Sequence, residues 1–313
     1  ILGGGPAGLI AAFYNPDYKI IDKNPMGQLN LPFVPGPRIL KVDEYSKKFI
    51  ERLHLDYYLK TIHIGYASDG INVVDEATTE FKQNYSQITR GTAKIEDSFL
   101  SSGENQIEVF ASSTGEDLYY KVFAILTEQL KDRIIAANVS SIDTKDRLIG
   151  LDRTDFLYDN VISTLNINIL FKLLGLQDLG LVALKKHFVQ CSYNNPIDIE
   201  NAKKYHYIYS TDEQYTRKTY FKDYIVYEML EPFDEQNRKF NIVSGENVIF
   251  DLSQIQGNKV IKALNNIPIQ INNSIDFRNI QGIELVGRFA QWNHSIKANE
   301  IIAKYERQIS RNF

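Results

Sequence analysis

Hydrophobic and polar positions follow a clear order at the start of the chain. The apolar pair at residues 1–2 precedes a glycine-rich turn, and an apolar helical stretch then covers residues 9–14. A polar turn at residues 15–17 leads into a short apolar strand at residues 18–21, which ends at Asp22. A strand, a helix and a second strand in this order predict a β-α-β unit, which is typical of parallel sheets.

Helical and strand-like patterns also recur further along the chain. Apolar positions with a helical period mark residues 41–55, residues 117–133 and a closing helix that carries Ile302, Tyr305 and Ile309. Residues 60–116 show short strand-like pieces between polar turns. Strands are predicted at residues 61–64, 106–110, 138–142, 147–149, 204–209, 215–221 and 224–229. The patterns together predict an α/β fold with an antiparallel sheet in its second half.

Composition narrows the class of protein. The chain has 313 residues, of which 43% are hydrophobic, and a net charge of −4 without basic runs, which argues against a nucleic-acid groove. Cys191 cannot form an internal disulfide, so a reducing, cytoplasmic setting is expected. No apolar run has the length of a membrane span, and the 5 histidines lack metal-ligand spacing. The chain begins at Ile1 without a methionine, so we expect residues before it. No pattern in the sequence predicts an oligomeric state.

The opening glycines form the pattern G-x-G-x-x-G, with glycines at positions 3, 5 and 8. Gly3 permits the tight turn, Gly5 lets a pyrophosphate approach the backbone, and Gly8 lets the helix pack on the strand. The helix N-terminus attracts phosphate charge, and Asp22 stands where an acid binds ribose hydroxyls. The pattern predicts a dinucleotide site, and the alternative is a purely structural glycine turn.

The residues after Asp22 favour FAD over NAD as the dinucleotide. A glycine pair or Gly-Gln sits soon after the acid in flavoproteins of the glutathione-reductase type, and Lys23, Gly27, Gln28 and Leu29 suit that pattern. The proline-rich stretch at residues 31–38 predicts an extended segment, which interrupts the simple repeat of an NAD dehydrogenase.

The opening Gly3-Gly4-Gly5-Pro6-Ala7-Gly8-Leu9, the acid, Gly27 and the segment 36–40 resemble the FAD-dependent amine oxidase and UDP-galactopyranose mutase superfamily. In the mutases, the matching segment carries a Gly-x-His-Ile-Phe-His motif that faces the flavin ring. This chain has Gly36-Pro37-Arg38-Ile39-Leu40-Lys41, so both histidines are absent, which argues against the mutase reaction itself.

The resemblance also implies cofactor residues beyond the first motif. Val139 and Thr164 match the positions whose backbone lies at the adenine and beside the cofactor. The C-terminal stretch resembles a strand end and helix start that contact the diphosphate and ribityl chain. Its implied cofactor residues are Gly287, Arg288, Trp292, Asn293, His294 and Ser295. Trp292 could instead pack in the core, and His294 could be a structural histidine.

The resemblance places the substrate beside a tyrosine-rich sheet. Tyr209, Arg217 and Tyr220 match a tyrosine strand followed by an arginine near the ligand, and Arg38 and His294 are also expected to be catalytic residues. Arg217 would grip an anionic substrate group bidentately, and Arg38 and Arg217 are expected to face the isoalloxazine. The alternative is an antiparallel sheet with cross-strand tyrosine pairs.

The sequence therefore predicts a Rossmann-like FAD-binding domain with an inserted α+β substrate domain. The FAD part is expected to be discontinuous, over residues 1–40, 117–165 and 276–313, and the substrate part to cover residues 41–116 and 166–275. The expected activity is that of an FAD-dependent oxidoreductase that transfers hydride from a small polar substrate to flavin N5. Two alternatives stay open: a non-redox mutase that acts on a sugar nucleotide, and a non-catalytic FAD-binding protein.

Overall fold

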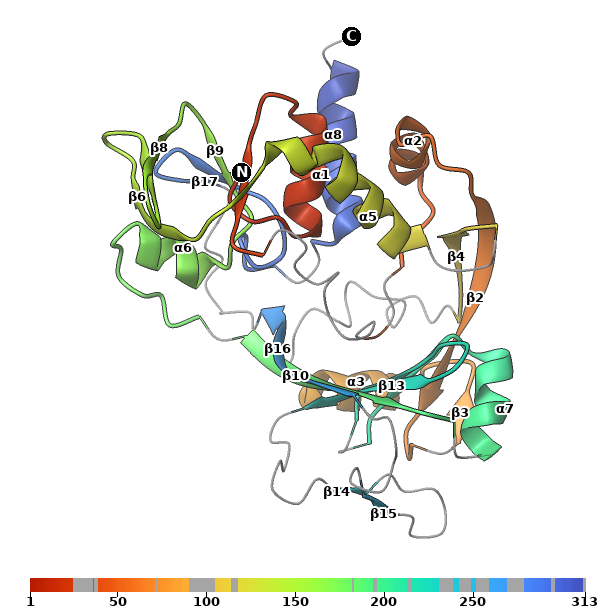
Figure 1. Cartoon of the computed structure of the whole chain (residues 1–313). Helices are drawn as coiled ribbons and strands as arrows, with labels where there is room; N and C mark the ends of the chain where they lie inside the picture. Colours follow the sequence, from red (N-terminus) through yellow and green to blue (C-terminus); the bar gives the residue numbers. More distant parts are fainter. Residues whose placement is uncertain are drawn as a thin grey trace.

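The computed structural model describes two main groups of elements, a helical part and a broad sheet (Figure 1). The described residues are 1–24, 36, 39–70, 72–89, 105–113, 118–181, 183–193, 196–212, 215–230, 239–241, 249–251, 259–268, 279–293 and 296–311. No helix within these ranges is long and apolar enough to cross a membrane.

A small, mostly parallel sheet gathers strands from distant parts of the chain. In spatial order, its strands are β5 (Ile134–Ala136), β1 (Ile20–Asp22), β9 (Val161–Ser163), β18 (Ile283–Leu285) and the antiparallel edge strand β17 (Asn279–Ile280). Leu2 joins the two halves, because it bridges Ile21 on one side and Ser163 on the other, both in parallel. The glycine turn that follows Leu2 therefore leaves the sheet at its centre.

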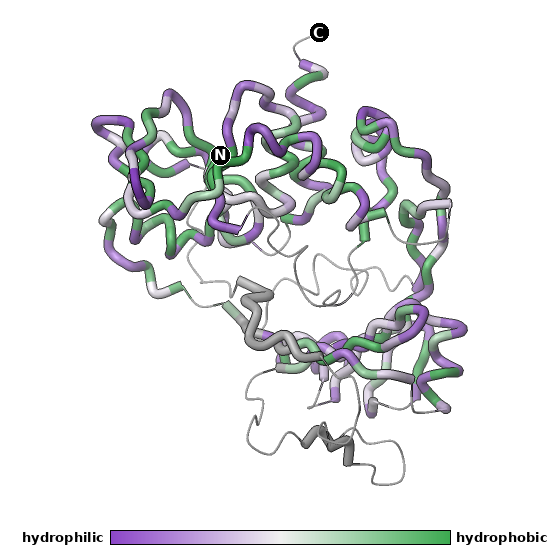
Figure 2. Tube along the Cα trace, in the orientation of Figure 1, coloured by the Kyte–Doolittle hydropathy of each residue, from purple (hydrophilic) through white to green (hydrophobic). Residues whose placement is uncertain are grey.

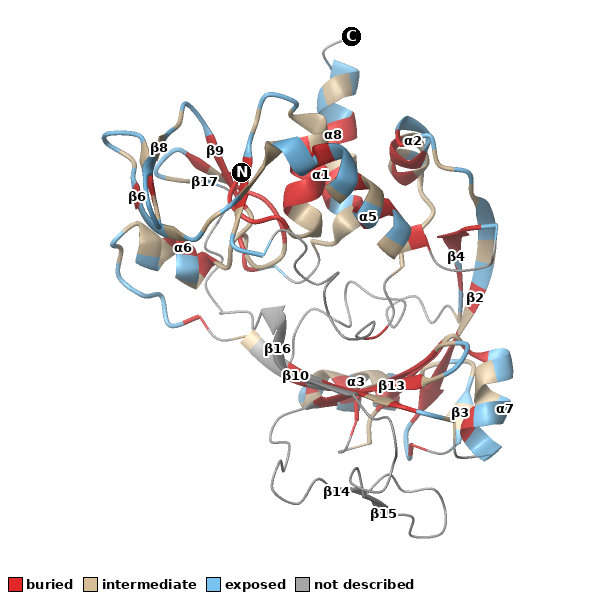
Figure 3. Ribbon diagram, viewed as in Figure 1, coloured by how far each residue is buried: buried red, intermediate tan, exposed pale blue. Residues whose placement is uncertain are grey.

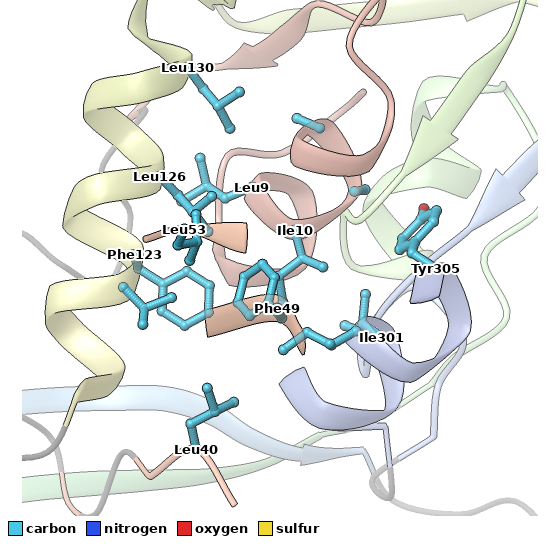
Figure 4. Packing of buried hydrophobic residues seen from close by; sticks show 14 of the residues in the cluster. Leu9, Ile10, Leu40, Phe49, Leu53, Phe123, Leu126, Leu130, Ile301 and Tyr305 are labelled. Atoms are coloured by element: carbon cyan, nitrogen blue, oxygen red, sulfur yellow. The ribbon is translucent and has the colours of Figure 1, made fainter. Parts of the chain in front are cut away.

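Four helices enclose the main hydrophobic core beside this sheet. They are α1 (Pro6–Tyr14), α2 (Glu44–Arg52), α5 (Leu118–Leu130) and α8 (Ala298–Arg311). Figure 4 shows one side chain or more from each helix pointing toward the others: Leu9, Ile10, Phe49, Leu126 and Ile301. Burying each such side chain stabilises the fold by about 1.5–3 kcal/mol. Because α1 contributes several of them, the core holds α1 in its position beside the sheet.

The pattern along each helix matches its place in the core. Figure 3 shows α1 largely buried, whereas the outer side of α5 is exposed. Figure 2 shows hydrophobic and hydrophilic residues alternating along α8, as expected for a helix with one buried face. Helix α2 begins later than the predicted residue 41, because the Asp43 side chain accepts a hydrogen bond from the Ser46 amide at 2.7 Å and caps the helix.

A buried glutamate holds three of these helices together. Glu306 on α8 accepts hydrogen bonds from the Tyr14 hydroxyl at 2.6 Å and from Arg52 Nε at 2.9 Å, and it is only 1% exposed. Helix α2, which the sequence assigned to the substrate part, is thereby tied to α1 and α8. The domain boundaries themselves stay a prediction.

The second part is built on an eight-stranded sheet, counted over the described residues. In spatial order, its strands are β16 (Lys259–Pro268), β10 (Ala183–Cys191), β13 (Ile225–Leu230), β12 (Arg217–Tyr220), β11 (Tyr207–Ser210), β2 (Tyr58–Ala67) and β3 (Val73–Val74), and β4 (Gln106–Ala111) also pairs with β2. All neighbours are antiparallel except β11 and β2, which run parallel. The predicted antiparallel sheet in the second half of the chain is confirmed.

One helix packs on each face of this sheet. Helix α3 (Thr79–Ile88) places Phe81 and Tyr85 against Tyr66 and Tyr209 on one face. Helix α7 (Pro196–Lys204) lies on the opposite face. The two faces of the sheet therefore have different partners and can serve different roles.

Two local predictions are wrong in this part. Residues 79–88 form α3, a helix that was not predicted among the strand-like pieces of residues 60–116; Thr78 caps it by accepting from the Phe81 amide at 3.0 Å. The strand predicted at residues 204–209 starts only at Tyr207, since α7 continues to Lys204.

The remaining elements lie around these two sheets. They are the strands β6 (Val139–Asp143), β7 (Leu148–Leu151) and β8 (Asp155–Leu157), the helix α6 (Ile167–Leu173), a 3₁₀ turn (Lys131–Arg133), and the paired strands β14 (Lys239–Asn241) and β15 (Ile249–Asp251). Helix α6 packs through Ile167 and Leu170 into the same cluster as Leu2.

Asp198 stabilises the contact between α7 and the sheet. Its carboxylate accepts hydrogen bonds from Lys218 Nζ at 3.1 Å and from the hydroxyls of Tyr220 at 3.1 Å and Tyr227 at 3.0 Å, and it is 2% exposed. Removing one partner of a buried ion pair costs about 3–5 kcal/mol.

We therefore expect Asp198→Asn to lower the free energy of unfolding by about 3 kcal/mol in a urea titration, because Lys218 loses its buried counter-ion. Glu200→Gln on the same helix is the matched control, because Glu200 pairs with Lys203 in the solvent and such pairs contribute at most about 1 kcal/mol. Equal effects of the two substitutions would contradict a structural role for Asp198.

Candidate functional site

The glycine turn and the start of α1 are packed so closely that no side chain fits between them at Gly8. A Cβ atom at Gly8 would lie 1.9 Å from the carbonyl oxygen of Gly3, and Gly3 itself has a φ of +99°. A Cβ atom at Gly5 would meet no atom of the described residues within 4 Å. The turn is thus filled on the side of Gly3 and Gly8 and open at Gly5, as the spacing of the three glycines predicts.

The open side is also where α1 begins. Gly5 is the N-cap residue and no side chain caps this end, while Pro6 occupies the first helical position. The amides of the first turn and the positive end of the helix dipole are directed toward this opening. An anionic group such as a diphosphate suits such a place.

Asp22 lies beside this turn, at the end of β1. Its Oδ2 accepts a hydrogen bond from the Gly4 amide at 2.5 Å, and its Oδ1 accepts one from the Asn24 amide at 2.6 Å. Each carboxylate oxygen can accept more than one hydrogen bond, so the group can also accept from ribose hydroxyls. The structure therefore brings the predicted acid and the glycine turn together.

Thr164 supports the turn from the neighbouring strand. Its hydroxyl donates to the Leu2 carbonyl at 3.0 Å, and a Cβ at Gly3 would come within 2.4 Å of that hydroxyl oxygen. Val139 starts β6, three residues after Ala136, whose Cα is the register partner of Asp22. Thr164 therefore contacts the turn, and Lys23 lies exposed just after Asp22.

The C-terminal motif meets the same helix start. Gly287 has a φ of +103°, and a Cβ there would lie 2.9 Å from the Cβ of Ala7. The preceding Val286 amide donates to the Ser163 carbonyl at 3.0 Å, which positions the motif at the end of the parallel sheet. Arg288 follows directly, so two motifs about 280 residues apart in sequence converge on one place.

Trp292 belongs to the hydrophobic core. It is 5% exposed and lies in one cluster with Ile167 and Leu285, with the Phe289 ring 6.2 Å away between centroids. This placement supports the packing alternative over a contact with the ribityl chain. The Asn293 amide donates to the Arg288 carbonyl at 2.9 Å and closes the turn between them.

Several expected site residues lie outside the described part of the chain. They are Gly27, Gln28, Leu29, Arg38, His294 and Ser295. Within the described ranges, no group of three His, Cys, Asp or Glu side chains could hold a metal ion. Burial raises the pKa of Cys191 to about 12, and Asp198 adds to the effect, so this thiol is not a nucleophile at neutral pH.

A second polar group lies on the face of the large sheet that carries α3. Arg217 on β12 and Glu228 on β13 are register partners, and both Nε and Nη2 of Arg217 donate to Glu228 Oε1. The guanidinium lies 5.8 Å from the ring centroids of both Tyr207 and Tyr209. Arg217 and Tyr209 therefore lie side by side, as the sequence predicts. Two of the donor atoms of Arg217, Nε and Nη2, are already bonded to Glu228.

Tyr220 does not join this group. It points to the opposite face, where its hydroxyl donates to Asp198 at 3.1 Å. Burial, strengthened by the charge of Asp198, raises the pKa of Tyr220 far above its ordinary value, so the hydroxyl stays protonated. The structure therefore does not bring Tyr220 together with Arg217 and Tyr209, because strand residues three apart face opposite sides.

Gly36 connects the sheet face to the segment that resembles the flavin-facing motif of the superfamily. It has a φ of +91°, and a Cβ there would lie 2.6 Å from Glu228 Oε1 and 3.4 Å from Arg217 Nη2. The backbone at Gly36 thus rests on the Arg217–Glu228 pair. This contact places the pair next to the start of the predicted motif.

Glu228 and Lys186, which pairs with the same carboxylate as Arg217, were not predicted from the sequence. The signal was present, since Glu228 interrupts the apolar run from Ile225 to Leu230. A charged residue inside a buried strand needs a partner, and the partner comes from another strand that the sequence alone does not identify.

Comparisons with known proteins give a likeness to solved structures alone. No protein-family model and no curated protein sequence matches the chain. A reduced UDP-galactopyranose mutase aligns over 99% of this chain and 94% of its own, with a TM-score of 0.67 and 12% identity. A cyclohexylamine oxidase from Brevibacterium oxydans aligns over 99% and 98%, with a TM-score of 0.64 and 10% identity.

The chain shares its fold with this mutase and this amine oxidase. A fatty acid isomerase from P. acnes shares this fold as well, over 100% of this chain and 97% of its own, with a TM-score of 0.63 and 10% identity. The resemblance that the sequence motifs indicated is confirmed at the level of the fold. Oxidases, a mutase and an isomerase on one fold show that the reaction must be argued from the site.

Gly8 and Gly5 make a matched pair for a stability test, because one is closely packed and the other is open. We expect Gly8→Ala to lower the free energy of unfolding by about 3 kcal/mol or more, because its Cβ would overlap the Gly3 carbonyl. Gly5→Ala should change it by at most about 1 kcal/mol, since its Cβ enters open space. Urea unfolding measures both, and a tolerated Gly8→Ala would contradict the close packing.

Proposed function

We propose that the chain is an FAD-dependent oxidoreductase, similar to amine oxidases, that transfers a hydride from a small polar substrate to flavin N5. The observation that carries this proposal is the glycine turn, which is open at Gly5, flanked by Asp22 and met from the other end of the chain by Gly287. The fold shared with amine oxidases supports it.

The residues around the turn fit the parts of FAD. The start of α1 at Gly5 and Pro6 would hold the diphosphate, Asp22 the adenosine ribose, and Gly287 with Arg288 the far side of the diphosphate. When bound, FAD supplies a ring that accepts two electrons and a proton as hydride. The discontinuous Rossmann-like domain that the sequence predicts is part of this proposal.

The chain's own residues would then bind and orient the substrate. Gly36 rests on the Arg217–Glu228 pair, and Tyr207 and Tyr209 flank the guanidinium. We assign these side chains to the substrate side of the flavin, where they position the reacting carbon and exclude water. No proton-transfer residue is needed for this assignment, because hydride transfer is chemistry of the cofactor.

We expect Gly5→Ala to reduce FAD affinity roughly ten- to hundredfold, because a methyl group in the open side displaces one phosphate–amide contact worth about 1.5–3 kcal/mol. Glu200→Gln is the control, since Glu200 lies on α7, on the other side of the large sheet, and pairs with Lys203 in the solvent. Titration of the apoprotein with FAD, followed by flavin fluorescence, measures both variants. A purified protein that is colourless and refuses added FAD would sink the cofactor assignment.

The reaction class is tested by anaerobic mixing with amines, alcohols and sugars. An oxidoreductase should bleach its flavin absorbance with one class of substrate and regain it when air is admitted. The likeness to the reduced mutase makes non-redox chemistry the second candidate. That candidate predicts turnover only after dithionite reduction, with no net consumption of reductant and no bleaching by substrate.

A further inference from the structure

The peptide group between Gly3 and Gly4 is held by a side chain at each of its polar ends. Its carbonyl oxygen, on Gly3, accepts a hydrogen bond from the Thr164 hydroxyl at 3.3 Å. Its amide, on Gly4, donates to Asp22 Oδ2 at 2.5 Å. The carbonyl and the amide of a planar trans peptide point in opposite directions, so Thr164 and Asp22 bind this peptide from opposite sides.

The preceding peptide group, between Leu2 and Gly3, is fixed in the same way. The Leu2 carbonyl accepts from the Thr164 amide at 2.8 Å and from the Thr164 hydroxyl at 3.0 Å, and the Gly3 amide donates to the Ile21 carbonyl at 3.0 Å. The hydroxyl has one proton, so the Leu2 and Gly3 carbonyls share it in a three-centre hydrogen bond. Thr164 therefore orients both carbonyl groups of the turn.

The Thr164 hydroxyl also occupies the space that two glycines leave. A Cβ atom at Gly3 would lie 2.4 Å from Thr164 Oγ1, and one at Gly8 would lie 3.4 Å from it. A methyl group in place of this hydroxyl would need more room and could not donate a hydrogen bond. The peptide groups of the turn would then lose the partner that sets their orientation.

The hydrogen bonds form a chain that ends at Asp22. A peptide carbonyl that accepts a hydrogen bond makes the amide of the same peptide a better donor, because bonds in a chain polarise one another. The Gly4 amide uses this strength on a carboxylate, where hydrogen bonds are short and strong. Asp22 is only half-buried and precedes the exposed Lys23, so its carboxylate is held from the protein side and keeps an accessible side.

We propose that Thr164 is a positioning residue that acts through the Gly3–Gly4 peptide on Asp22, and that it thereby sets the affinity of Asp22 for the hydroxyl groups of a nucleotide ribose. This role adds to the predicted place of Thr164 beside the cofactor. It rests on the proposed function for the assignment of Asp22 to the adenosine ribose.

The test compares ADP, which carries the adenosine and both phosphates of FAD, with 2′,3′-dideoxy-ADP, which lacks the ribose hydroxyls. Dissociation constants are measured by titration calorimetry on the full chain, freed of any bound flavin. The wild-type protein should bind ADP about tenfold more tightly or better, because the hydroxyls donate to a charged group. Thr164→Val should lower this preference about threefold or more, since one hydrogen bond of the chain is lost.

Three further variants show whether the effect belongs to the hydroxyl and passes through Asp22. Thr164→Ser keeps the hydroxyl and should keep the preference within about twofold. Thr164→Val added to Asp22→Asn should lower the preference no further, because both residues act on one contact. Thr127→Val is the matched control and should leave the preference unchanged. Thr127 is also half-buried, and its hydroxyl donates to a backbone carbonyl, that of Phe123, at 2.8 Å.

The ratio of the two dissociation constants separates positioning from a merely structural role. A Thr164→Val protein that binds both nucleotides more weakly by the same factor would overturn the proposal, as would a Thr164→Ser protein that loses the preference. A wild-type protein that does not distinguish the nucleotides would also overturn it. If Thr164→Val does not fold, the smaller Thr164→Ala, which lacks the hydroxyl as well, takes its place.

The same samples distinguish this inference from the proposed function, because their FAD content is measured by absorbance. A chain that refuses FAD but shows the Thr164-dependent preference for ADP would retain the inference for another adenine nucleotide, and the proposed function would fall. A chain that binds FAD but shows no such dependence would overturn the inference alone. A chain that binds neither FAD nor ADP would overturn both.

Discussion

The start of α1 can lie against the glycine turn only because Gly8 has no side chain. The arrangement of the residues around this turn depends on that contact. With a Cβ 1.9 Å from the Gly3 carbonyl, the helix would have to move away from the strand. The helix is fixed from its other side by the core around Leu9 and Ile10, so little movement is available. The turn, the helix and the core therefore constrain one another.

The central place of Leu2 in the sheet explains why distant residues meet at this turn. Its neighbours are β1, which ends at Asp22, and β9, which leads to Thr164. The next strand, β18, leads to Gly287, which contacts Ala7. Parallel strands end at the same edge, so the residues that follow them gather at the helix N-terminus. The order of the strands in the sheet thus explains why residues from the ends of β1, β9 and β18 all contact the glycine turn or the start of α1.

Local chemistry could be predicted from the sequence, whereas pairing between distant strands could not. The glycine spacing, the acid at the end of β1 and the helix predicted at residues 9–14 follow from short-range rules, and the structure contains all three, with the helix beginning at Pro6. Tyr220 could have been separated from Arg217 in advance, because strand residues an odd number apart face opposite sides. The partnership of Arg217 with Glu228 depends on the register of β12 and β13, which no local pattern in the chain specifies.

The two ion pairs of β12 lie on opposite faces of the sheet and differ in how far they are enclosed. Lys218 and Asp198 join the sheet to α7, and both are enclosed. Arg217 and Glu228 lie under Gly36 instead, and the arginine keeps an accessible edge. A buried pair is seldom the best way to stabilise a sheet, since apolar residues of similar volume often do as well or better. Arg217 keeps an exposed edge, and the proposed function gives this edge a role, because a guanidinium fixed by a carboxylate can still donate hydrogen bonds to a ligand.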